Sequence, residues 1–159
     1  MYSASGTAPA AYARLRSERD PVRIPERRAD GMVSVDSTWG TVQPIVVAPG
    51  VATVGELELI EHASAGGQLI DTRVRESVAT GTIPGAEGIP SAEIAAHAGR
   101  FTPERPAILF CNGPQCLATP RSIRALLEAG CEPSALRYYR GGLQDWVSLG
   151  YPLEVPEPG

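Results

Sequence analysis

Residues 107–120 read AILFCNGPQCLATP, and they contain a strand, a loop and the start of a helix in direct succession. The apolar run Ala107–Phe110 is short and is bounded by turn residues, which is typical of a buried strand. Thr119 is a favourable N-cap residue, and Pro120 then occupies the first helical position, where its missing N–H costs nothing. The intervening loop, residues 111–118, begins with a cysteine.

Alternating strand and helix patterns extend on both sides of this segment. The expected strands are residues 42–47, 68–72, 86–89, 107–110 and 136–139, and the expected helices are residues 53–65, 75–79, 91–98, 119–129 and 143–149. Thr53 with Glu56 three residues later is a capping-box signal for the first of these helices. Strands that alternate with helices predict an α/β fold: a small three-layer domain with a central, mainly parallel sheet and helices on both faces.

Three segments with reactive or charged side chains follow expected strands. They are Asp71–Arg75, Cys111–Ala118 and Arg140–Gly142. In parallel sheets, ligands bind beyond the carboxyl ends of the strands. We therefore expect these three segments to meet at one edge of the sheet and to form the functional site.

The length and composition fit one domain with an extension. The chain has 159 residues, of which 43% are hydrophobic and 20% charged, so one ordinary core is expected. Residues 1–40 are rich in Ser, Pro, Ala and Arg, and proline interrupts any long helix. We interpret residues 1–40 as an N-terminal extension, either a flexible or a docked arm, and residues 41–155 as the domain.

Charge and hydropathy exclude two classes of partner. All 14 basic residues are arginine, the formal net charge is −4, and the body after residue 30 is acidic, which argues against nucleic acid. No apolar run approaches the roughly 20 residues that span a bilayer, so no membrane partner is expected. Met1–Ala13 lacks a charged start followed by an apolar block, so the expectation is a cytoplasmic protein.

The cysteines favour chemistry over a structural role. There are three, Cys111, Cys116 and Cys131, and an odd number without a secretory signal does not predict a disulfide framework. Their spacing does not fit a metal site, so no metal and no cofactor are expected. Backbone N–H groups of the loop and the helix start can hold an anion. They would lower the pKa of Cys111 and favour its thiolate.

Four motifs in order resemble the rhodanese homology domain. They are Leu69-Ile70-Asp71-Thr72-Arg73, Gly81-Thr82-Ile83-Pro84-Gly85-Ala86, Ile108-Leu109-Phe110-Cys111 and Gly141-Gly142-Leu143-Gln144-Asp145-Trp146, and the likeness extends from about residue 53 to residue 153. The resemblance implies a single-domain sulfurtransferase in which Cys111 is the nucleophile. It also implies structural roles for Asp71, Arg73, Gly85, Gly142 and Trp146.

The implied reaction moves a sulfane sulfur. A donor such as thiosulfate would load Cys111 as a persulfide, and a thiophilic acceptor would remove the sulfur. The expected partners are therefore a small sulfur-containing anion or thiol, with cyanide as an acceptor in vitro and a protein cysteine as an acceptor in the cell. The proposed active-site loop comprises Asn112, Gly113, Pro114, Gln115, Cys116, Leu117, Ala118 and Thr119.

Two positions depart from the family pattern. Thr82 stands where the family has histidine, which changes the local hydrogen bonding. The loop after Cys111 contains no Arg or Lys, so backbone N–H groups and neighbouring loops must bind the anion. Arg75 and Arg140 follow other strands and are the candidate substrate-binding residues, although each also fits a solvated surface arginine.

The roles of the other cysteines stay open. Cys116 is a small loop residue, a resolving thiol that reacts with Cys111, or the nucleophile itself. Cys131 follows Gly130 at the entry to a strand and is interpreted as a packing residue.

Two other functions compete with sulfur transfer. A non-catalytic or regulatory module that binds a protein partner is possible on any fold, and the intact cysteine loop argues against it. A phosphatase or arsenate reductase would need Cys-x5-Arg. The sixth residue after Cys111 is Leu117 and the sixth after Cys116 is Ser122, so neither register fits.

Overall fold

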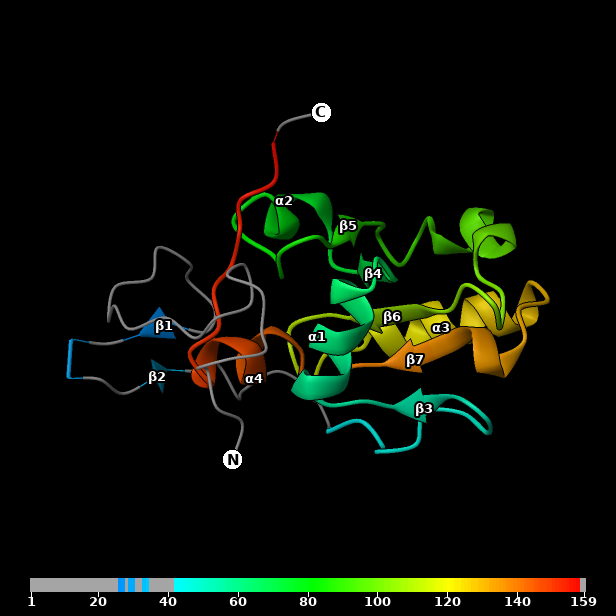
Figure 1. Cartoon of the computed structure of the whole chain (residues 1–159), viewed down its shortest axis with the longest axis horizontal. Coiled ribbons are helices and arrows are strands. Elements are labelled where there is room, and N and C mark those ends of the chain that lie inside the picture. Colours follow the sequence, from blue (N-terminus) through cyan, green and yellow to red (C-terminus); the bar gives the residue numbers. More distant parts are fainter. Residues whose placement is uncertain (1–25, 28, 31–32, 35–41, 158–159) are drawn as a thin grey trace.

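The computed structural model describes residues 26–27, 29–30, 33–34 and 42–157, and its centre is a five-stranded sheet (Figure 1). The strands are β3 (Ala52–Thr53), β4 (Gln68–Asp71), β5 (Glu87–Gly88), β6 (Ala107–Phe110) and β7 (Leu136–Tyr138). Their spatial order is β3-β7-β6-β4-β5, and every neighbouring pair is parallel. The prediction of a parallel α/β sheet is confirmed.

Strand β6 occupies the middle of the sheet, and all four of its residues are buried. Ile108 and Phe110 belong to the core on one face, whereas Ala107 and Leu109 belong to the core on the other, as the two-residue period of a strand requires. Because β6 pairs with both β4 and β7, the residue that follows it lies between the ends of those strands.

Helices cover both faces of the sheet (Figure 1). The core on one face includes Leu59 of α1 (Glu56–Ser64) and Trp146 of α4 (Gly142–Ser148). The core on the other face includes side chains of α3 (Ala118–Glu128) and of a 3-10 helix (Ile94–Arg100). The short helix α2 (Arg75–Val78) follows β4.

The apolar run 42–47 does not form the predicted edge strand. Val42, Ile45 and Val46 are exposed, and the backbone of Gln43 bonds to the cysteine loop and to an arginine described below. A proline at position 44 has no N–H to donate to a ladder. The first strand of the sheet is instead β3.

Helix starts differ from the predicted ones because the capping residues have other partners. Gly55 is the N-cap of α1, and its N–H donates to Glu58 Oε1 at 3.1 Å, so the capping interaction lies two residues beyond Thr53. The Thr53 hydroxyl instead donates to the Ile45 carbonyl. Similarly, α3 begins at Ala118 rather than after Thr119. The helix predicted over residues 91–98 is the 3-10 helix Ile94–Arg100.

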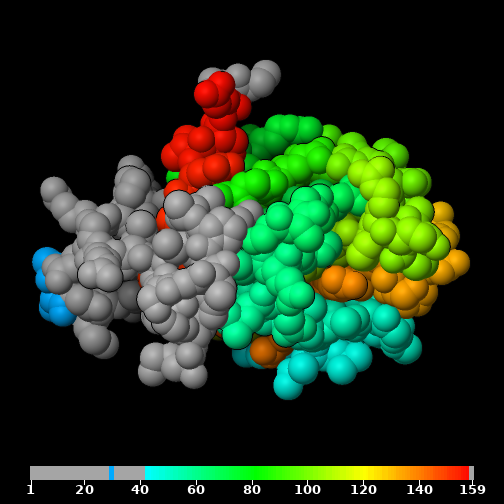
Figure 2. Space-filling view, in the orientation of Figure 1, coloured from blue at the N-terminus to red at the C-terminus, as the bar shows by residue number. Residues whose placement is uncertain are grey.

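Two outer segments lie beyond the sheet. Strands β1 (Glu26–Arg27) and β2 (Val33–Ser34) form an antiparallel pair, and the rest of the predicted extension lies outside the described residues. The C-terminal residues, red in Figure 2, extend from one side of the body. Within this segment the Glu154 N–H and carbonyl bond to Thr82 at 2.9 Å each. None of the helices in the described ranges has the length and apolar character needed to cross a membrane.

Candidate active site

Cys111 lies at the carboxyl edge of the sheet, directly after β6, and is 2% exposed. On one side the Thr72 N–H and hydroxyl donate to the Phe110 carbonyl, at 3.0 and 3.1 Å. On the other side the Tyr139 N–H donates to the Leu109 carbonyl at 3.0 Å. The ends of β4, β6 and β7 therefore converge on Cys111.

Carbonyl oxygens anchor the cysteine loop, residues 111–118, to its surroundings. The Cys111 and Asn112 carbonyls accept hydrogen bonds from Leu143 and Gln144 of α4, at 3.0 and 2.8 Å. The Pro114 carbonyl accepts one from the Gln43 N–H at 2.7 Å. Helix α4 and the segment that precedes β3 thus hold the loop from outside.

Backbone N–H groups of the loop point toward sulfur. The Thr119 N–H and hydroxyl bond to Cys111 sulfur, and the N–H groups of Ala118 and Asn112 bond to Cys116 sulfur. The Thr119 hydroxyl also lies 2.9 Å from that of Thr72. Donors from the loop and from the start of α3 therefore act on both thiols rather than on Cys111 alone.

The acidities of the two thiols reverse the sequence-based expectation. Burial, together with a thiol–thiol hydrogen bond to Cys116, raises the pKa of Cys111 well above its ordinary value. The hydrogen bond from Cys111, the N–H groups of Ala118 and Asn112, and the charge of Arg73 lower the pKa of Cys116 to about 6 despite its partial burial. The prediction that the pKa of Cys111 is lowered was wrong: the lowering falls on Cys116, because its sulfur is less buried and receives more donors.

We predict that iodoacetamide modifies Cys116 first. Its thiolate is the reactive form, so the rate should rise as the pH passes about 6 and level off above it. Peptide mapping after brief alkylation between pH 5 and pH 8 measures this. Cys116→Ser is the control. Its alkylation should be slow in this pH range, since burial raises the pKa of the two remaining thiols. First labelling at Cys111 would contradict the assignment.

Three buried polar atoms near this edge have no hydrogen-bond partner within the described residues. They are Gln115 Oε1, Tyr138 Oη and Gln144 Nε2. Gln144 packs so closely on Gly113 that a Cβ there would lie 2.6 Å from its Cδ. An unpaired buried donor is costly, so an amide N–H beside the loop is a ready partner for an anion. Sequence reasoning missed Gln144, which appears in its motif only as a helix residue.

Asp71 and Arg73 form a buried structural pair. Arg73 donates through Nη2 to Asp71 Oδ2 at 2.7 Å and to the Gly81 carbonyl at 2.7 Å. The Thr82 hydroxyl donates to the same Asp71 oxygen at 2.7 Å. Thr82 therefore ties the turn at residues 81–86 to the end of β4.

The two candidate substrate-binding arginines have other partners. Arg75 forms an exposed ion pair with Glu93 and lines a separate pocket of about 600 Å³. Arg140 donates through Nε and Nη2 to the Gln43 carbonyl, at 3.0 and 2.7 Å. Arg140 is thus linked to the cysteine loop through Gln43, which bonds to Pro114. Arg75 is instead paired with Glu93, which is not part of the loop.

The three other residues predicted to be structural have a constrained backbone or a buried side chain. Gly85 has a φ of +84°, and its N–H donates to Glu154 Oε1 at 3.0 Å. Trp146 is fully buried, and its Nε1 donates to the Pro152 carbonyl at 2.7 Å. Gly142 has a φ of +59°, and a Cβ there would collide with the Cys111 carbonyl and would lie 2.8 Å from the Gly113 nitrogen.

We predict that Gly142→Ala displaces the cysteine loop and lowers activity by about 100-fold, the effect of a misplacement of about 1 Å. Gly66→Ala is the matched control, because Gly66 also has a positive φ (+81°) but a Cβ there meets no atom within 4 Å. Both variants should lose about 1–3 kcal/mol from backbone strain, and Gly142→Ala should lose more. Denaturant unfolding and an assay of the sulfur transfer expected from the sequence measure the two effects. Equal activities would contradict the collision.

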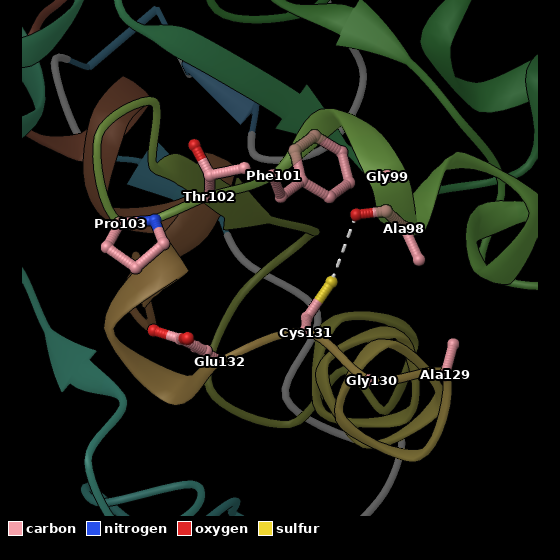
Figure 3. Close-up of a pocket in the computed structure, with 9 residues that line it drawn as sticks. All are labelled: Ala98, Gly99, Phe101, Thr102, Pro103, Ala129, Gly130, Cys131 and Glu132. Atoms are coloured by element: carbon pink, nitrogen blue, oxygen red, sulfur yellow. Dashed lines mark hydrogen bonds between the residues drawn. The ribbon is translucent and has the colours of Figure 1, made fainter.

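Cys131 lies away from this site. It precedes β7 and follows α3, so it sits at the amino edge of the sheet rather than the carboxyl edge. Its thiol points to the Ala98 carbonyl at 3.2 Å, at the wall of a shallow pocket of about 290 Å³ (Figure 3). Cys131 is therefore a suitable control residue for the chemistry of the other two thiols.

Among the residues that the structure describes, no three His, Cys, Asp or Glu side chains gather as metal ligands. What the site contains is a pair of interacting thiols in a loop of backbone donors, beside one unpaired amide. This arrangement can stabilise negative charge on sulfur and can exchange a proton between two cysteines.

Known proteins with similar sequences or structures agree with this fold. The HTH-type transcriptional regulator Rv0324 of Mycobacterium tuberculosis is 33% identical over 102 residues, which are 64% of this chain and 44% of that protein. The chain therefore spans less than half the length of this curated relative. The BH2092 protein of Bacillus halodurans has a similar structure, with a TM-score of 0.56 and 21% identity over 65% of this chain and 76% of its own.

The Alr3790 protein of Anabaena sp. also has a similar structure, with a TM-score of 0.55 and 23% identity over 65% of this chain and 83% of its own. At such identities the two structural likenesses concern the fold alone. The sequence profile of the rhodanese-like domain matches residues 56–149, more than half of the chain, from the start of α1 to the end of α4. On this match, and with the sheet and cysteine loop described above, the chain belongs to the rhodanese-like domain family.

Proposed function

We propose that the protein is a sulfurtransferase that carries a sulfane sulfur on Cys111. The observation that supports this most strongly is the setting of Cys111: it ends the central strand, receives two donors from Thr119, and shares a hydrogen bond with the Cys116 thiol. A buried thiol of raised pKa needs an adjacent base before it can attack. The Cys116 thiolate is that base, and it takes the Cys111 proton.

The first half-reaction forms the persulfide. The Cys111 thiolate attacks the outer sulfur of thiosulfate, the S–S bond of the donor breaks, and sulfite leaves with the bonding pair. The proton rests on Cys116, and Thr119 stabilises charge on the new persulfide. In the second half-reaction an acceptor thiolate or cyanide attacks the outer sulfur and restores the Cys111 thiolate.

Recognition of the donor anion combines one neutral donor with the charge of two arginines. Gln144 Nε2 is an unpaired N–H group beside the loop, and it donates to a sulfonate oxygen of the donor in this proposal. Arg140 contributes its charge from the end of β7, since its bonds to Gln43 do not use Nη1. Arg75, paired with Glu93, only steers anions at a distance.

Sulfite release tests the proposal. Thiosulfate without an acceptor should give a burst of about one equivalent of sulfite per chain, as covalent two-step catalysis requires. With a dithiol present to keep the cysteines reduced, added cyanide should then give continuous thiocyanate production. A protein that releases no sulfite from thiosulfate or from an organic thiosulfonate would not be a sulfurtransferase.

A regulatory module is the second candidate, and the likeness to the regulator Rv0324 favours it. In that case the loop would sense a sulfur species or bind a protein partner without turnover. The same burst measurement separates the two functions. Stoichiometric sulfite without turnover on addition of cyanide and a dithiol together indicates a sensor.

A further inference from the structure

We propose that Cys116 is a resolving thiol: it displaces hydrosulfide from the Cys111 persulfide and leaves a Cys111–Cys116 disulfide. The protein would then have a second activity, release of sulfide from sulfane-sulfur donors. This inference rests on the proposed persulfide and gives that persulfide an intramolecular fate.

The geometry of the loop brings the two residues together. The Cys116 N–H donates to the Gly113 carbonyl at 3.0 Å, which turns the loop back over its own start. The Cys111 thiol consequently donates to the Cys116 carbonyl at 3.7 Å, and a hydrogen bond also links the two thiols. The attacking sulfur is therefore already beside its target, which replaces an encounter in solution by a local step.

Burial decides which sulfur is attacked. Attack on the outer sulfur would expel the Cys111 thiolate, whose charge its buried site disfavours. Attack on Cys111 Sγ expels hydrosulfide, which leaves for solvent, and departure is faster for the less basic leaving group. Cys116 suits the attacking role because backbone N–H groups and the charge of Arg73 stabilise its thiolate at neutral pH.

The proposed step conserves atoms, protons and electrons. Cys116 returns the proton it took from Cys111 to the terminal sulfur of the persulfide, so that Cys111 carries S–SH and Cys116 is a thiolate. The Cys116 sulfur then forms a bond to Cys111 Sγ, the S–S bond of the persulfide breaks, and HS⁻ departs. The two cysteines are oxidised to a disulfide and the sulfane sulfur is reduced to sulfide. A low-molecular-weight thiol or a dithiol protein reduces the disulfide for the next cycle.

The test compares sulfide with sulfite in the absence of added thiol. Reduced, anaerobic wild type, Cys116→Ser and Cys131→Ser react with thiosulfate until sulfite release is complete. We expect a sulfide-to-sulfite ratio near one for wild type and Cys131→Ser, with an intact mass about 2 Da lower from disulfide formation. For Cys116→Ser we expect a ratio near zero and a stable gain of about 32 Da, a persulfide on Cys111.

The ratio does not depend on how fast each variant reacts, so a slower Cys116→Ser still gives an answer. A wild type that retains the extra 32 Da, roughly one sulfur, and releases no sulfide would overturn the resolving role while leaving sulfur transfer intact. An equal ratio in Cys116→Ser would also overturn it. If no variant releases sulfite, the persulfide itself is refuted and the proposed function fails with it.

Discussion

Replacing Cys111 with serine should lower sulfur transfer from thiosulfate by at least about 1000-fold, the scale on which loss of a covalent nucleophile acts. A serine hydroxyl cannot form a persulfide, and the neighbouring thiolate is too weak a base to ionise it. Both sulfite and thiocyanate should fall together, because the first half-reaction is lost. Stopped-flow sulfite detection and a cyanide assay measure the two products.

Two other cysteine variants show whether the loss is specific. Cys131→Ser should match wild type, since this thiol lies at the opposite edge of the sheet. Cys116→Ser should keep a measurable fraction of sulfite release, because it removes the proton acceptor but leaves the nucleophile. Equal loss in Cys111→Ser and Cys116→Ser would show that neither thiol works alone. Full activity of Cys111→Ser would make Cys116 the nucleophile.

The second large effect concerns stability: Asp71→Ala should lower the free energy of unfolding by about 3–5 kcal/mol, the cost of leaving one partner of a buried ion pair uncompensated. Asp71 is fully buried and accepts hydrogen bonds from the Arg73 side chain, the Arg73 N–H and the Thr82 hydroxyl. Urea denaturation followed by tryptophan fluorescence measures the change.

Glu93→Ala is the matched control, because it removes a carboxylate from an arginine pair at the surface. Arg75 and Glu93 are both largely exposed, so this loss should cost far less stability than the loss of Asp71. The contrast between the variants isolates burial, since both delete one carboxylate opposite one guanidinium. Equal costs would mean that Asp71 contributes no more than a surface ion pair.

The sheet could be predicted from the sequence because its strands are short apolar runs that end in distinctive residues. Ala107–Phe110 and Gln68–Asp71 have the predicted positions to within a residue. Residues 42–47 have the same β-branched composition, yet they form no strand, since composition does not reveal that Gln43 bonds to Pro114 and Arg140. Helix starts were misplaced where a threonine hydroxyl found a tertiary partner instead of a cap.

The position of the candidate site could be predicted from the sequence, but the relative acidity of its two thiols could not. The order of strands and loops predicts that Cys111 lies at the carboxyl edge, and it does. Whether a thiol ionises depends on its burial and on which N–H groups reach it, and these depend on the folded path of the loop. That path places Cys116 nearer to solvent and to more donors, so the acidity of the pair is a tertiary property.

The bonds of Gln43 have a mechanical consequence. This residue holds the Pro114 carbonyl through its N–H and the Arg140 side chain through its carbonyl, so the chain entering the domain is fastened to the cysteine loop. A force that acts on Gln43 therefore acts directly on the cysteine loop through the Pro114 carbonyl. By thermodynamic reciprocity, any change that sulfur loading makes at the Pro114 carbonyl alters the stability of the bonds that hold Gln43.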